Sequence, residues 1–131
     1  MSDQPLPFDS SAPRLGRDVA RRAIVAAELP VDVQRAVLLV VSELVTNGVQ
    51  HGRAPMSLVV LVADGMVHVA VSDGSASRPQ PRQAPDSAFR GRGLAIVAEA
   101  ASAWGIEQRG SGKTVWADIA TGHALRTEAP A

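Results

Sequence analysis

A long apolar run that ends at a glycine constrains this chain more than any other feature. It begins near Val37 and closes with the segment SELVTNGVQHG, residues 42–52. Because the run is too long for one strand, it predicts a helix from about Val31 to Gln50. Gly52 then stands where a glycine commonly follows the last helical turn. The side of this helix expected to face a core comprises Val37, Val41, Leu44, Val45 and Gly48.

Three polar side chains follow the border of that apolar face. Glu43, Asn47 and His51 are spaced four residues apart, and because each helical residue advances by roughly 100° they stack along one side. A carboxylate, a carboxamide and an imidazole beside a buried face suit the floor of a cleft. A solvated polar edge gives the same pattern, and the helix alone does not separate the two interpretations.

Composition excludes several classes of function. The chain has 131 residues, of which 46% are hydrophobic and 20% charged, as expected for one soluble domain with its own core. Thirteen basic residues balance thirteen acidic ones, so charge gives no reason to expect nucleic acid or an anionic membrane as a partner. The lack of cysteine excludes thiolate chemistry and fits a cytoplasmic location. We also expect no transmembrane helix and no signal peptide.

The rest of the pattern predicts two more helices and four strands. Asp64-Gly65 between two Val-rich runs is a strong hairpin signal. The expected helices cover 13–29 and 91–103, the strands 56–63, 66–72, 104–108 and 113–119, and a Pro-rich loop 75–90. This order predicts an α+β fold, a two-layer sandwich with helices on one face of a mostly antiparallel, mixed sheet. We expect a flexible segment at 1–12, a folded domain at 13–120 and a flexible tail at 121–131.

Two glycines stand at the mouth of the third predicted helix. At Gly91 and Gly93, free backbone N–H groups and the positive end of the helix dipole favour an anion, and glycine allows it to come close. Such a pair taken alone is more often a simple turn. The surroundings are neither a P-loop nor a dinucleotide fingerprint, because no GxxxxGK motif and no βαβ unit occur.

Three oxygen-bearing side chains are candidates for direct chemistry. Asp73 ends a strand before a turn, where it forms either a local turn contact or a buried acceptor for an amino group such as that of adenine. The carbonyl oxygen of Asn47 suits a hydrated Mg²⁺ ion, which prefers oxygen ligands and shares phosphates with a substrate. Glu43, one turn earlier, can accept a proton from a hydroxyl or water nucleophile.

Taken together, these motifs resemble the GHKL (Bergerat-fold) ATP-binding superfamily. The resemblance covers roughly Pro13 to Ile119 and is closest to the small anti-sigma-factor serine/threonine kinases of the RsbW-like type. The motifs are, in order, Glu43-x-x-x-Asn47-x-x-x-His51-Gly52, Asp73, Gly91-Arg92-Gly93-Leu94 and Gly112-Lys113-Thr114-Val115-Trp116.

The resemblance implies a site for ATP and Mg²⁺. It implies that Glu43 is the general base for a serine hydroxyl, that Asn47 binds Mg²⁺ and that Asp73 binds the adenine amino group, directly and through water. Thr114 would lie near the adenine, on the last strand. The Pro-rich loop would be the ATP lid. The residues implied at the phosphates are Gly91 and Gly93, the backbone that follows from Leu94, and Arg90 and Arg92 as further candidates.

The resemblance also implies partners. A kinase of this type phosphorylates a STAS-domain anti-anti-sigma protein, sequesters a sigma factor in its alternative state, makes no direct contact with nucleic acid and is often a homodimer. One motif departs from the family pattern Asp-x-Gly-x-Gly, because the chain has Asp73-Gly74-Ser75-Ala76-Ser77. A catalytically weak or inactive ATP-binding module that switches between partners is therefore the alternative expectation.

Overall fold

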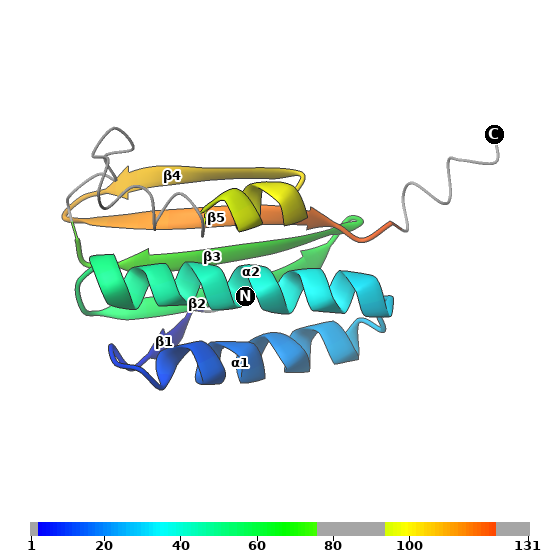
Figure 1. The fold of residues 1–131 in the computed structure, drawn as a ribbon, viewed down its shortest axis with the longest axis horizontal. Coiled ribbons are helices and arrows are strands. Elements are labelled where there is room, and N and C mark those ends of the chain that lie inside the picture. Colours follow the sequence, from blue (N-terminus) through cyan, green and yellow to red (C-terminus); the bar gives the residue numbers. More distant parts are fainter. Residues whose placement is uncertain (1–2, 76–93, 123–131) are drawn as a thin grey trace.

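The structure, a computed structural model, describes residues 3–75 and 94–122 (Figure 1). Residues 94–100 form a helix that carries no label in the figure. The labelled elements are β1 (Gln4–Leu6), α1 (Ala12–Ala26), α2 (Val31–His51), β2 (Met56–Ala63), β3 (Met66–Asp73), β4 (Ala103–Arg109) and β5 (Gly112–Ala120).

The strands form one sheet in the order β1-β2-β3-β5-β4. Among the described residues, the helices all lie on one face of it (Figure 1). The predicted two-layer α+β fold is therefore confirmed. Every pairing among the described strands is antiparallel, so the mixed character expected for the sheet is absent there. The β2–β3 and β4–β5 pairs are hairpins, in which a tight turn is enough to join antiparallel neighbours. Asp64 and Gly65 both have positive φ, 56° and 74°, as a type I′ turn requires.

Helix α2 carries the largest part of the core. It packs against β3, β5 and α1, and its predicted apolar side is buried as expected. The approach of α1 is close, because a Cβ on Gly16 would lie 3.3 Å from the side chains of Val41 and Val45. The sequence periodicity therefore identified both the helix and the side that it buries.

The main difference from the sequence prediction lies at the N-terminus. Residues 4–6 form β1 within the segment expected to be flexible, and Leu6 enters the core with 8% exposure. A strand of three residues that contains Pro5 has no readable period, and proline is tolerated because β1 is an edge strand. Beyond β1, the Ser11 hydroxyl and then the Ser11 amide donate to Asp9, and these bonds hold the pKa of the Asp9 carboxyl below its ordinary value.

Other boundaries differ slightly. Helix α1 ends at Ala26 rather than near Leu29, and the third helix ends at residue 100 because β4 begins at Ala103. The predicted lid loop beyond Ser75, the start of the third helix at 91–93 and the tail from residue 123 onward lie outside the described residues. None of the described helices is long and apolar enough to cross a membrane.

Leu44→Ala is expected to lower the free energy of unfolding by about 3 kcal/mol, because Leu44 is only 2% exposed and its truncation leaves a cavity. Leu39 on the same helix is 43% exposed, so Leu39→Ala is the matched control and should cost less than about 1 kcal/mol. Urea unfolding of both variants measures the difference. Equal losses would contradict the packing of α2 described here.

Candidate functional site

The C-terminal end of α2 meets the end of β3. Gly52 donates its N–H to the Gly48 carbonyl at 2.8 Å and follows the last turn of α2. A Cβ on Gly52 would lie 2.6 Å from the carboxyl carbon of Asp73, so the close approach depends on glycine. The Gly74 N–H donates to the Arg53 carbonyl at 2.7 Å. These contacts fix Asp73 directly beside the end of α2.

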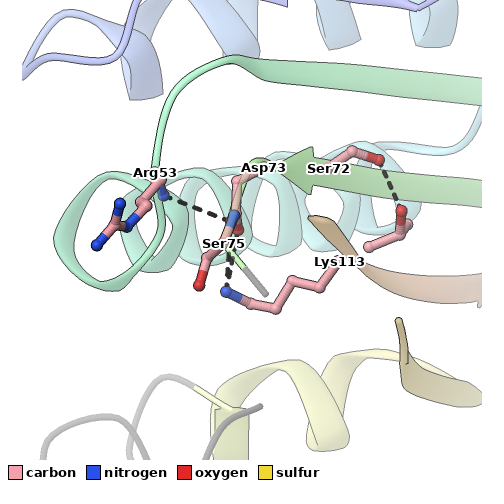
Figure 2. A network of polar contacts seen from close by, with 6 residues as sticks. Arg53, Ser72, Asp73, Ser75 and Lys113 are labelled. Atoms are coloured by element: carbon pink, nitrogen blue, oxygen red, sulfur yellow. Dashed lines mark hydrogen bonds and ion pairs between the residues drawn. The ribbon is translucent and has the colours of Figure 1, made fainter. Parts of the chain in front are cut away.

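The Asp73 carboxylate is buried and hydrogen-bonded (Figure 2). Its Oδ1 accepts the N–H of Ser75 at 2.7 Å and, at the longer distance of 3.4 Å, the N–H of Arg53. The Lys113 ammonium lies 3.1 Å from Oδ2. A buried carboxylate needs such partners because burying an unpaired charge is very costly. Asp73 is therefore a pre-positioned acceptor.

Lys113 is the site residue that sequence reasoning missed. It is the cross-strand neighbour of Asp73, and its side chain is 9% exposed. On β5 it shares the helix-facing row with Val115, Ala117 and Ile119, since side chains alternate along a strand. The one available signal was that Lys113 is the only lysine among thirteen basic residues.

Thr114 points to the opposite face of the sheet from Asp73 and Lys113. Its hydroxyl lies 2.7 Å from the hydroxyl of Ser72. Ser72 precedes Asp73 and Thr114 follows Lys113, so the alternation of side chains along a strand places both hydroxyls on the face of the sheet opposite the helices. On β5, the side chain that contacts Asp73 is Lys113, and Thr114 is paired elsewhere.

Glu43 and Asn47 lie on the edge of α2 that faces away from α1. Val41 and Val45 of α2 pack against Gly16 of α1. Glu43 comes two residues after Val41, and Asn47 comes two residues after Val45. Each polar residue therefore lies about 160° around the helix from its valine. In Figure 1, α1 and helix 94–100 lie on opposite sides of α2. Both side chains are half-buried, whereas His51 in the last turn is exposed. The predicted polar edge therefore leads along α2 toward Asp73.

The predicted phosphate-binding residues are only partly visible. Arg90, Gly91, Arg92 and Gly93 lie outside the described residues, and Leu94 begins the described part of the third helix. That helix is anchored by Val97, which is fully buried. Within residues 3–75 and 94–122, no cluster of three or more His, Asp or Glu side chains is placed to hold a metal ion.

Comparison with proteins of known structure shows a shared fold. The RsbU and RsbW domains of a Mycobacterium tuberculosis protein superpose with a TM-score of 0.69 at 21% identity, over 92% of this chain and 32% of that one. The histidine kinase domain of a blue-light activated kinase from Erythrobacter litoralis gives 0.52 at 25% identity, over 76% of this chain and 50% of that one. Histidine kinase AdeS from Acinetobacter baumannii gives a TM-score of 0.56 at 10% identity, over 94% of this chain and 69% of that one. This chain thus spans about a third of the Mycobacterium tuberculosis chain and half of the Erythrobacter litoralis chain.

Sequence comparison identifies the family. No curated protein sequence is significantly similar to this chain. Residues 7–119, however, match the family described as the histidine kinase-like ATPase domain. This match confirms the GHKL resemblance of the four motifs and covers all of α1, α2, β2, β3 and β4. The chain therefore belongs to the histidine kinase-like ATPase domain family.

Proposed function

We propose that this chain binds ATP and Mg²⁺ between α2 and the end of β3 and phosphorylates a serine or threonine of a STAS-domain anti-anti-sigma protein. Membership of an ATPase domain family implies ATP binding. The observation that supports the site most strongly is that the end of α2, the helix that carries the half-buried Glu43 and Asn47, lies directly beside the buried carboxylate of Asp73.

Asp73 is proposed to bind the base. Its carboxylate is fixed by the Ser75 amide at 2.7 Å, and such a rigid buried acceptor suits the amino group of adenine. A base that lacked this donor would leave the carboxylate facing an acceptor, which is costly inside a protein. The end of the site at Asp73 is therefore proposed to give adenine specificity.

Asn47 is proposed to hold Mg²⁺. The described residues offer no all-protein cage of acidic side chains, and Mg²⁺ commonly uses one or two protein oxygens together with substrate phosphates and water. A half-buried carboxamide on a rigid helix fits that role. The bound ion would neutralise charge on the phosphates, and Asn47 would set its position relative to Glu43.

Glu43 is proposed to be the general base. It lies one helical turn before Asn47 and would take the proton of the substrate hydroxyl. The hydroxyl oxygen then forms a bond to the γ-phosphorus while the bond to the β-phosphate oxygen breaks, and ADP leaves. Phosphoryl transfer depends mainly on positioning and charge neutralisation, so a small domain with a rigid α2 suffices for it.

The partners and organisation are part of the same proposal. We infer that the ATP-binding domain spans residues 13–120 with β1 attached to its sheet, that the chain works in the cytoplasm as a homodimer, and that it sequesters a sigma factor when not acting on its substrate. The similarity in fold to a structure that contains an RsbW domain supports this choice of partners.

The proposal predicts Mg²⁺-dependent binding of ATP that Asn47→Ala weakens. Calorimetry in the presence of Mg²⁺ should show that Asn47→Ala binds ATP about tenfold or more weakly than the wild type, as for a lost contact to a charged group. Gln50→Ala, at an exposed position of the same helix, is the control and should bind like the wild type. ATP binding that depends on neither Mg²⁺ nor Asn47 would remove Asn47 from the site.

A non-catalytic function is the second candidate. The turn after Asp73 departs from the family's glycine pattern, and the carboxylate is already paired with Lys113. Both features favour a module in which ATP controls partner binding without phosphoryl transfer. Steady phosphorylation of a cognate STAS-domain protein would exclude this alternative.

A further inference from the structure

The buried ion pair at the site gives Lys113 a function of its own. We propose that Lys113 is a second base-recognition residue, which donates to a ring nitrogen of adenine while Asp73 accepts from the adjacent amino group. The inference rests on the proposed ATP binding and extends it. It assigns a role to a residue that contacts Asp73 directly, with 3.1 Å between Nζ and Oδ2.

The pair presents an acceptor and a donor side by side. Adenine presents the complementary pattern, because its amino group is a donor flanked by the ring nitrogens N1 and N7, which are acceptors. A base that places its amino group on Asp73 therefore brings one of these nitrogens next to the Lys113 ammonium. Two neighbouring hydrogen bonds of this kind define the base more sharply than one carboxylate alone.

Both groups retain hydrogen-bonding capacity after they pair. A carboxylate has about four acceptor positions and an ammonium has three donors. Within residues 3–75 and 94–122, the donors on Asp73 are the amides of Ser75 and Arg53 and the Lys113 ammonium, and the acceptors on Lys113 are the two Asp73 oxygens. Among the described residues, Oδ2 of Asp73 therefore carries a single donor and at least one proton of Lys113 has no acceptor, which leaves each group a position for a base.

Stability explains why a cation lies opposite the buried Asp73, but it does not explain why the two positions hold a charged pair at all. The same row of β5 continues with Val115, Ala117 and Ile119, which pack in or against the core. A buried ion pair roughly breaks even with an apolar pair of similar size, because desolvation offsets the attraction between the charges. Two apolar residues at positions 73 and 113 would therefore continue the core without a loss of stability, whereas the charged pair supplies an acceptor and a donor at the base.

Calorimetry with four nucleotides on the full chain tests the inference. ATP, 1-deaza-ATP and 7-deaza-ATP differ only in whether N1 or N7 can accept a hydrogen bond, and ITP replaces the amino group with an oxygen. We expect one deaza analogue to bind about 10- to 100-fold more weakly than ATP, as for a lost bond to a charged donor, and the other to match ATP. ITP should bind weakly because Asp73 would face its oxygen.

A variant assigns the effect to Lys113. In Lys113→Met the sensitive deaza analogue and ATP should bind equally, whereas Lys113→Arg, which keeps a charged donor, should still distinguish them. If Lys113→Met fails to fold, the wild-type series decides alone. Two deaza analogues that both bind like ATP would overturn the role of Lys113 and leave the proposed ATP site intact. Absence of ATP binding, or ITP binding as tight as ATP, would overturn the proposed base site as well.

Discussion

Glu43→Gln is expected to reduce phosphorylation of the protein substrate by about 10²- to 10⁴-fold, the range typical of a lost general base. Glutamine has nearly the same shape and similar helix propensity, so α2 should remain intact. The glutamine side chain, however, cannot accept the proton of the attacking hydroxyl at neutral pH. ATP affinity should stay unchanged, because Glu43 is proposed to act on the substrate hydroxyl and not on the nucleotide.

Single-turnover phosphorylation of a STAS-domain substrate measures this effect, and calorimetry measures ATP binding in parallel. Glu28→Gln provides the control, since it makes the same chemical change at an exposed residue between α1 and α2. An unchanged rate in Glu43→Gln would show that Glu43 is not the base. A parallel loss of ATP binding would instead place Glu43 among the nucleotide ligands.

Helix α2 and the strands could be predicted because their signals are local. The apolar period of α2 extends over several turns, and Val41, Leu44 and Val45 are buried as that period required. The Asp64-Gly65 turn likewise fixed the β2–β3 hairpin. The strand β1 gave no such signal, because three residues are too few for a period and their pairing with β2 depends on the complete sheet.

The pairing of Asp73 could not be predicted from sequence for the same reason. Thr114 and Lys113 are adjacent on β5, and which of them faces Asp73 depends on the register between β3 and β5. A shift of one residue would exchange the two faces of the strand. The sequence located the turn after Asp73 and the strand that contains Lys113 and Thr114. Only the register between β3 and β5 shows that Lys113, and not Thr114, contacts the Asp73 carboxylate.

Asp73→Asn and Lys113→Met are each expected to lower the free energy of unfolding by about 3–5 kcal/mol, because each leaves the other charge buried without its partner. The side chains are 2% and 9% exposed, so water cannot replace the missing ion. The double variant should recover most of that loss, since replacing both charges removes the unpaired ion. Urea unfolding of the four proteins gives the coupling energy directly.

The exposed pair Arg21–Asp18 supplies the control for this cycle. Its charges are 3.0 Å apart, close to the 3.1 Å at Lys113–Asp73, but its side chains are 52% and 48% exposed. Asp18→Asn should therefore cost less than about 1 kcal/mol. If Asp73→Asn cost no more than Asp18→Asn, the Asp73–Lys113 pair would be solvated rather than buried. In that case water would occupy Asp73 and Lys113 in the empty site, and adenine would have to displace it to make the proposed contacts.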